Sequence, residues 1–189
     1  MTLRFAALAG ALIVGVACLT DAAWIHVKAN LAQLLIAQAW ERAERGGIGA
    51  RPWPWADTRP IARLIVTGAE PRSLVVLEGS SGRNLAFGPA HDPVSVLPGE
   101  RGNSIIAGHR DTHFRFLEKL QIGDRLAVER KGVQSGFVVT GMTIVDSRTN
   151  RIALQSDVPR LTLVTCYPFD AISPGGPLRF VVTADAEQR

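Results

Sequence analysis

Eight short β-type runs, each bounded by turn residues, constrain the fold of this chain more than any other feature. They follow one another from residue 61 to the C-terminal region, are rich in Val, Ile and Thr, and are separated by Gly, Pro, Asn or Asp. The runs read ARLIVTG, SLVVLEG, NLAFG, SIIAG, DRLAVER, GFVVTGMTIVDS, RLTLVTC and LRFVVTA. This pattern predicts an all-β domain, an eight-stranded closed or nearly closed β-barrel.

One segment between the strands has helical character. The sequence THFRFLEKLQIGD predicts a helix over 112–124, capped at its start by Asp111 or Thr112 and ended by Gly123. Arg110 and Asp111 are expected to pair with each other or to cap this helix. The expected buried face consists of Phe116, Leu117 and Leu120.

An apolar segment precedes the barrel. Residues 5–20 carry no charge, and the apolar character continues to residue 25, which gives nearly the length that crosses a bilayer. We therefore expect a signal-anchor transmembrane helix over residues 1–28. A cleaved signal peptide, a lipoprotein signal at Cys18 and a helix buried in a soluble protein are the alternatives.

The charge distribution agrees with a membrane rather than a nucleic acid as partner. Residues 1–63 hold seven basic and four acidic residues, whereas residues 64–189 hold fourteen and thirteen, so the barrel is nearly neutral. Aromatic residues are too few and scattered for base stacking. Arg4 before the apolar segment and Asp21 after it predict a cytoplasmic N-terminus in a single-pass protein of the cytoplasmic (inner) membrane, with the barrel extracytoplasmic or periplasmic.

A linker joins the apolar segment to the barrel. Residues 29–45 place apolar residues on one helical face and predict a stalk helix, which Gly46 and Gly47 end. The Pro- and Trp-rich stretch 51–60 reads as an extended connector. The expected organisation is therefore an anchor over 1–28, a stalk and connector over 29–60, and a barrel domain over 61–189.

Three side chains with reactive chemistry follow or begin predicted strands. Cys166 ends the run LTLVTC, and His109 follows SIIAG. Arg179 is the second residue of the strand that resumes at Leu178 after eleven intervening residues. If the two later strands are antiparallel neighbours, Cys166 and Arg179 face one rim of the barrel, and His109 can reach it. A thiol beside a histidine and a fixed guanidinium is suited to nucleophilic acyl chemistry.

These segments also resemble a known family. LTLVTC (161–166) resembles the TLxTC active-site motif of sortases, AGHRDTHF (107–114) their catalytic-histidine segment, and PLRFVV (177–182) their catalytic-arginine strand. The likeness covers roughly residues 60–185 in the family's order. The anchor and WPWADT (53–58) resemble the sortases of Gram-negative bacteria.

The resemblance implies a cysteine transpeptidase with a sortase-like barrel. Cys166 would attack a carbonyl in an LPxTG-like motif near the C-terminus of a target protein and form a thioacyl enzyme. His109 would protonate the leaving amine and assist an amine acceptor, and Arg179 would stabilise the oxyanion. Thr165 would contribute a hydroxyl to the substrate or oxyanion region. No cofactor is implied.

Other functions are compatible with the residues alone. A non-catalytic, membrane-anchored barrel that binds peptides would make Cys166 structural, and a cysteine peptidase would hydrolyse without transfer. The four-residue spacing of His109 and His113 is also found in zinc sites on helices, but no H-E-x-x-H motif or paired cysteines accompany it, so no metal is predicted.

Overall fold

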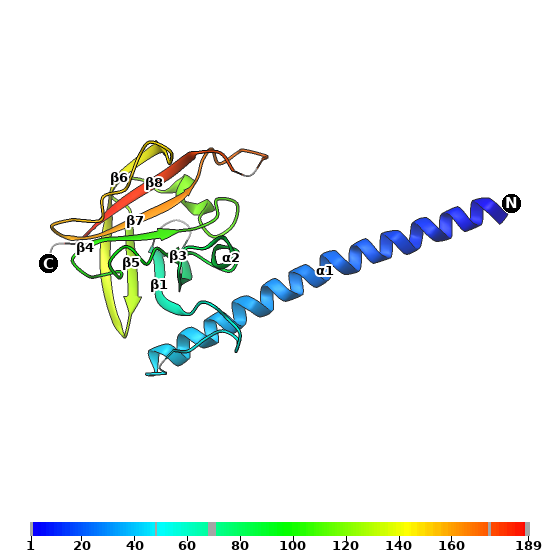
Figure 1. The fold of residues 1–189 in the computed structure, drawn as a ribbon, viewed down its shortest axis with the longest axis horizontal. Coiled ribbons are helices and arrows are strands. Elements are labelled where there is room, and N and C mark those ends of the chain that lie inside the picture. The colour runs from blue at the N-terminus through cyan, green and yellow to red at the C-terminus, as the bar shows by residue number, and fades with distance from the viewer. Residues whose placement is uncertain (1, 48, 68–70, 174, 188–189) are drawn as a thin grey trace.

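A β-barrel packed on one end of a long helix makes up the protein (Figure 1). The computed structural model describes residues 2–47, 49–67, 71–173 and 175–187. In chain order the elements are α1 Thr2–Glu44, β1 Pro60–Thr67, β2 Arg72–Glu78, α2 Gly82–Leu85, β3 Ala90–His91, β4 Gly102–Ala107, the 3₁₀ helix η1 Arg115–Lys119, β5 Arg125–Arg130, β6 Val133–Asp146, β7 Pro159–Cys166 and β8 Leu178–Ala186.

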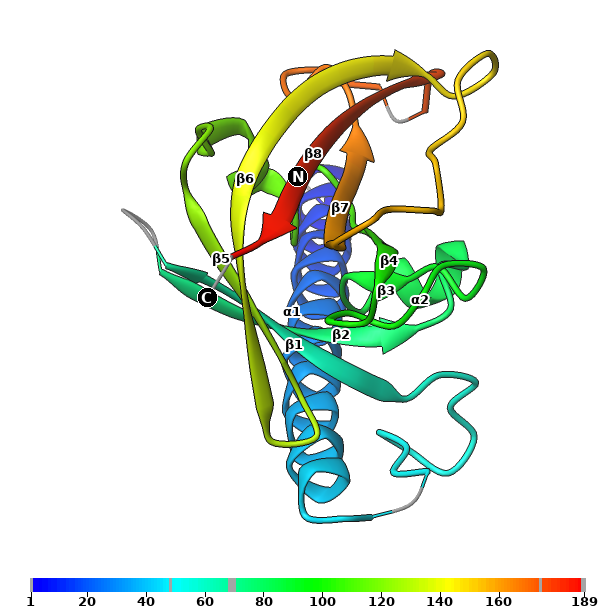
Figure 2. The same ribbon diagram turned by 90° about the vertical axis from the view of Figure 1, so that its left-hand side faces the viewer.

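The eight strands close into a barrel in the order β1-β2-β3-β4-β7-β8-β6-β5. Pairing is antiparallel except for β2 with β3 and β4 with β7, which run parallel. The parallel pair β4–β7 brings strands that are far apart in sequence side by side, with both carboxyl ends at the same edge (Figure 2). The expected eight-stranded all-β barrel is confirmed.

Alternation along the strands explains why the barrel forms. In β1, buried and half-buried residues alternate, and Ala62, Leu64 and Val66 point into the core. The largest buried side chains inside the barrel are Leu64, Ile106, Phe114, Leu117, Leu126, Phe137, Leu161 and Leu163. Burial of this apolar surface is the main favourable contribution to folding.

One predicted strand is wrong. The run NLAFG contains the end of the short helix α2, and the strand at this place is the two-residue β3 that follows it. Ser81 caps α2 by accepting a hydrogen bond from the Asn84 backbone NH at 3.3 Å, and the buried Asn84 amide donates to the carbonyls of Glu78 and Gly79. These side-chain bonds outweigh the weak β pattern.

The predicted helix over 112–124 is also shorter than expected. Residues 110–114 form turns, and only Arg115–Lys119 is helical, as η1. Phe114 rather than Asp111 or Thr112 stands at the cap position, without a side-chain capping bond. The expected apolar face is nevertheless correct, because Phe116 and Leu117 are buried and Leu120 packs against the core.

The C-terminal part of α1 packs on the outside of the barrel, behind β1 and β2 (Figure 2). Ile36, Ala39 and Trp40 are buried there. The Glu41 carboxylate accepts a hydrogen bond from the Arg63 guanidinium at 2.9 Å. The Glu44 carboxylate accepts from the backbone NH groups of residues 131 and 132, in the β5–β6 turn. The expected stalk therefore belongs to the barrel's packing and is continuous with the segment before it.

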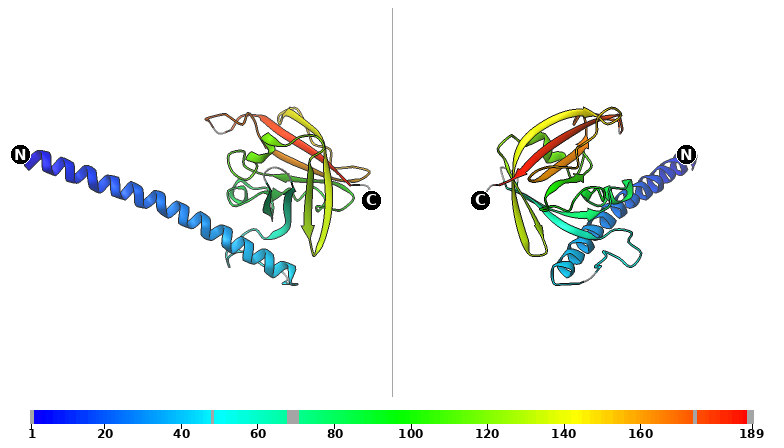
Figure 3. Two further views of the ribbon diagram at one scale, coloured as in Figure 1. Left: turned by 180° about the vertical axis from the view of Figure 1, so that it is seen from behind. Right: turned by 60° about the vertical axis from the view of Figure 1, so that its left-hand side comes forward.

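The N-terminal half of α1 projects away from the barrel (Figures 1 and 3). Its described apolar side chains, among them Leu12, Val16 and Ile25, are exposed. Within the described residues, no helix contains a stretch that is both long and apolar enough to span a membrane. Residue 1 and the side chains of Arg4 and Asp21, on which the expected orientation rests, lie outside the described part.

Candidate active site

The β7–β8 pair brings together two of the three predicted catalytic residues. Cys166, the last residue of β7, lies directly opposite Arg179 of β8 in the antiparallel ladder. Directly opposed residues point to the same face of a sheet. Because Leu161 and Leu163 point into the core, Cys166 and Arg179 face outward, at the end of the barrel wall. Cys166 is a half-buried free thiol.

The third residue, His109, comes alongside through the parallel pair β4–β7. Ala107 lies opposite Val164, and the Gly108 NH continues the ladder by donating to the Val164 carbonyl at 3.1 Å. His109 is the next residue and is exposed, at the level where Cys166 ends β7. The thiol therefore has the histidine segment on one side and the arginine strand on the other.

Thr165 joins the two strands at this point. Its hydroxyl donates to the Gly108 carbonyl at 2.8 Å, and its side chain is 2% exposed on the inner face. This bond fixes the backbone immediately before both Cys166 and His109. The predicted contact of the Thr165 hydroxyl with substrate stays a prediction.

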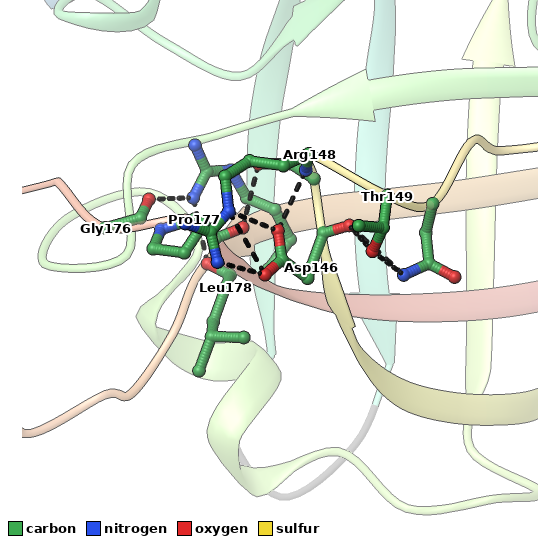
Figure 4. Close-up of polar contacts among 9 residues, drawn as sticks. Asp146, Arg148, Thr149, Gly176, Pro177 and Leu178 are labelled. Carbon is green, nitrogen blue, oxygen red and sulfur yellow. Dashed lines mark hydrogen bonds and ion pairs between the residues drawn. The ribbon is translucent and has the colours of Figure 1, made fainter.

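The Arg179 guanidinium is held by its own loop. Its Nη1 donates to the carbonyls of Gly176 at 2.7 Å and Leu178 at 2.9 Å. Asp146, the last residue of β6, lies opposite Leu178 in the ladder and is paired with Arg148 (Figure 4). The hydrogen bonds from Arg148 lower the pKa of Asp146, and the charge of Arg179 acts in the same direction.

The segment after β6 is hydrogen-bonded to the barrel near both of its ends. At one end, the NH and the hydroxyl of Ser147 donate to the Pro177 carbonyl at 2.9 and 2.8 Å, which ties the segment to the loop before Arg179. At the other end, the Asn103 amide donates to the Ala153 carbonyl at 2.7 Å and its Oδ1 accepts from the Thr162 hydroxyl. Residues 147–158 therefore cross the outer face of β4 and β7.

Arg110 makes contacts that sequence reasoning missed. Its guanidinium pairs with Asp111 as predicted, with Nε to Oδ1 at 2.8 Å, but it also donates to the carbonyls of Pro168 at 2.6 Å and Ala171 at 2.8 Å. The Arg110 side chain is 4% exposed. A backbone carbonyl has no residue signature, so the sequence carries no signal for these bonds to the loop after Cys166.

Two ionisable groups near His109 have shifted pKa values. Burial lowers the pKa of His113, and the charge of His109 lowers it further. The hydrogen bond from Arg110 lowers the pKa of Asp111. His113 is therefore held neutral and Asp111 ionised at neutral pH. Among the described residues, no group of three or more His, Cys, Asp or Glu side chains lies together as a metal site would require.

This arrangement has the parts required for acyl transfer through a thioester. A thiol can attack a carbonyl, an exposed imidazole beside it can move protons near neutral pH, and a guanidinium can stabilise an oxyanion. The half-buried thiol lies on the outward face of the strand pair. Pairing of β7 with β8 places Arg179 beside Cys166, and pairing of β4 with β7 brings the segment of His109 to the other side.

Comparison with known proteins shows what the chain is similar to. Residues 66–187, more than half of the chain, match the family described as "Sortase domain". Sortase D of Bacillus subtilis (strain 168) is 34% identical over 110 residues, which is 58% of this chain and 55% of that protein. The chain thus spans about half the length of this relative.

Solved structures resemble the barrel. Sortase A from Corynebacterium diphtheriae superposes with a TM-score of 0.63 at 22% identity, covering 71% of this chain and 64% of that chain. A Clostridium perfringens structure described as a Sortase D5 transpeptidase gives a TM-score of 0.60 at 27% identity, covering 69% and 80%. The expected likeness to sortases of Gram-negative bacteria concerns a subclass that these relatives do not address, and it stays a prediction.

Proposed function

Because the chain belongs to the sortase family, we propose that it is a cysteine transpeptidase that cuts an LPxTG-like motif near the C-terminus of a target protein and transfers the new end to an amine. The observation that carries this proposal is the ladder pairing of Cys166 with Arg179, with the His109 segment on the other side of the thiol. The Clostridium perfringens relative is itself described as a transpeptidase.

In the first half-reaction, the Cys166 thiolate attacks a backbone carbonyl carbon of the motif. The carbonyl electron pair moves to oxygen, and Arg179 stabilises the resulting oxyanion. The oxyanion then collapses, the carbon–nitrogen bond breaks, and a thioester forms. His109, as imidazolium, gives its proton to the departing amine.

In the second half-reaction, the amine acceptor attacks the thioester carbonyl, and neutral His109 takes the proton from its nitrogen. The carbon–sulfur bond breaks and returns the Cys166 thiolate, so that the enzyme is restored and an amide remains. Water in place of the amine gives hydrolysis. A peptidase that only hydrolyses is therefore the alternative that shares every step up to the thioester.

We further propose that the N-terminal half of α1 holds the enzyme at a lipid bilayer, with the barrel on the extracytoplasmic side. Exposed Val, Leu, Ile and Trp side chains over residues 12–27 support this, since water-exposed apolar surface of this extent needs a covering. Membrane attachment would place the enzyme and a membrane-tethered target in one plane and raise their effective concentration.

Product analysis tests the proposed activity. The full-length chain in detergent is incubated with LPxTG-like peptides, with and without candidate amines, and the products are identified by mass spectrometry. We expect cleavage within the motif and, with an accepted amine, an amide product. Cleavage to acid alone with every amine would favour the hydrolase, and cleavage by the Cys166→Ala variant would contradict the role of the thiol.

A further inference from the structure

Arg110 is a buried cation that the proposed reaction does not use. Arg110 follows His109 directly in the chain, and its side chain is 4% exposed. Its guanidinium donates hydrogen bonds to groups within the protein. An arginine is seldom buried without a partner, because its charge loses hydration. Asp111 supplies a counter-charge but is itself 62% exposed, so the pair alone does not require Arg110 to be buried.

The bonds of Arg110 connect two segments that must stay together for catalysis. Nη1 donates to the Pro168 carbonyl and Nη2 to the Ala171 carbonyl, both in the loop that follows Cys166. The Asp111 carboxylate accepts from Nε and Nη2 at 2.8 and 3.1 Å, which fixes the plane of the guanidinium. The segment that carries His109 is thus joined to the loop that leaves Cys166.

Other contacts hold the same loop from the opposite side. The Tyr167 NH donates to the Leu178 carbonyl at 3.1 Å, and Phe169 packs its ring against Phe180 at 5.3 Å. These contacts join the loop to β8, the arginine side of the site. The bonds of Arg110 join the loop to the histidine side, beyond the end of β4. The position of the loop relative to His109 therefore depends on Arg110.

Arg110 keeps its charge despite its burial. The hydrogen bond to Asp111 raises the pKa of Arg110, and the charges of Cys166 and Asp170 raise it further, against burial. All of its N–H donors therefore stay in place at neutral pH. Lysine could supply this charge but not the planar fork that reaches two carbonyls and a carboxylate.

We propose that Arg110 is a positioning residue for transpeptidation, which joins the His109 segment to the loop after Cys166. The inference rests on the proposed function, because it assigns Arg110 to the reaction at Cys166.

Two substitutions test this role. Arg110→Gln removes the charge and the fork, whereas Arg110→Lys keeps a charge and removes the fork. Arg160→Gln is the matched control, because Arg160 makes a similar two-bond pair with Asp185, at 2.6 and 3.2 Å, at the other end of β7. Circular dichroism shows whether each variant is folded.

The full-length chain in detergent gives two readouts. One is kcat and KM for an LPxTG-like peptide. The other is the rate of alkylation by iodoacetamide at one pH, measured by mass spectrometry on the peptide that contains Cys166, so that Cys18 does not contribute. A residue with a purely structural role would lower the unfolding free energy without changing kcat or the alkylation rate of the folded variant.

We expect Arg110→Gln to lower kcat by roughly 10²-fold, as misplacement of reacting groups does, and to raise the alkylation rate of the half-buried Cys166, because the loop that follows it is no longer held. Arg110→Lys should lower kcat at least about tenfold and raise the alkylation rate as well, because it lacks the planar fork. Arg160→Gln should keep both at wild-type values. If Arg110→Gln does not fold, Arg110→Lys decides the proposal.

Other outcomes contradict the proposal. A wild-type kcat or a wild-type alkylation rate in folded Arg110→Gln refutes it, and a wild-type kcat in Arg110→Lys refutes the role of the planar fork. A wild-type enzyme that cleaves no peptide would count against the proposed function instead. In that event the alkylation rates of the wild type and Arg110→Gln still decide whether Arg110 holds the loop beside the thiol.

Discussion

At the scale of single residues, Arg179 has donors for both its loop and a substrate. Its Nη1 is bonded to the carbonyls of Gly176 and Leu178, and a guanidinium carries five N–H donors in all. We expect Arg179→Ala to lose roughly 10²–10³ in kcat, the usual cost of removing an oxyanion donor. Peptide cleavage by a variant of normal circular dichroism measures this, and a rate within about twofold of wild type would exclude the role.

Position 108 requires glycine because the Phe114 ring lies close to its Cα, and not because of its backbone angles. A Cβ at this position would lie 2.6 Å from the Phe114 ring, so Gly108→Ala must displace either the ring or the backbone before His109. We expect destabilisation by about 1–3 kcal/mol, as for other overpacked sites, and lower kcat. Gly141→Ala is the control, because its Cβ would meet only Thr183 at 3.9 Å. Equal urea midpoints for the two variants would refute this explanation.

His113 links folding stability to pH. Burial lowers the pKa of His113 below the ordinary value, and the charge of His109 lowers it further. Below about pH 6.5 the unfolded chain therefore binds more protons at this position than the folded chain. This contribution to stability is therefore lost as pH falls. We expect His113→Gln to give a shallower decline in unfolding free energy between about pH 7 and pH 5. Parallel curves in urea denaturation would contradict the assignment.

At the scale of elements, the C-terminal part of α1 is a component of the barrel. Ala39 is fully buried between α1 and the strands, whereas Ala37 is exposed on the same helix. Ala39→Arg should separate the helix from β1 and β2 and cost about 3 kcal/mol or more, since each large apolar side chain contributes roughly 1.5–3 kcal/mol when buried. Ala37→Arg should have little effect. The difference in thermal midpoint checks the packing.

The alternation of apolar residues and the turn residues predicted those elements whose structure depends on neighbours in the sequence. Alternation in β7 and β8 predicted the strands and, through their pairing, the meeting of Cys166 and Arg179. The short helix α2 was missed because the hydrogen bonds of Ser81 and Asn84 decide it. The Arg110 bonds were missed because their partners are backbone carbonyls that are 58 and 61 residues away in the chain.

At the scale of the whole molecule, the site faces the direction in which α1 leaves. The carboxyl ends of β4 and β7 and the β7–β8 loop point to the side on which the N-terminal half of α1 projects (Figures 1 and 3). If that half binds a bilayer, the site is turned toward membrane-tethered targets. The N-terminal half of α1 and the site are thus connected through the packed C-terminal part of the same helix.

Truncation separates the two halves of α1. A chain that begins at residue 29 keeps the buried residues 32, 36, 39 and 40 but loses the exposed apolar half. We expect it to cleave free peptide within about twofold of the full-length rate, and to cut a vesicle-tethered target at least about tenfold more slowly than the full-length chain in the same vesicles. Equal rates on the tethered target would show that the helix does not concentrate the enzyme at the bilayer.

The thioester at Cys166 is the direct test of the central claim. Intact-protein mass spectrometry of the full-length chain, quenched during turnover of an LPxTG-like peptide, measures the mass added to the enzyme. We predict an adduct equal to the acyl part of the peptide, located on Cys166 by fragmentation, present in Cys18→Ala and absent in Cys166→Ala. Peptide turnover without an adduct, or an adduct that persists in Cys166→Ala, would contradict it.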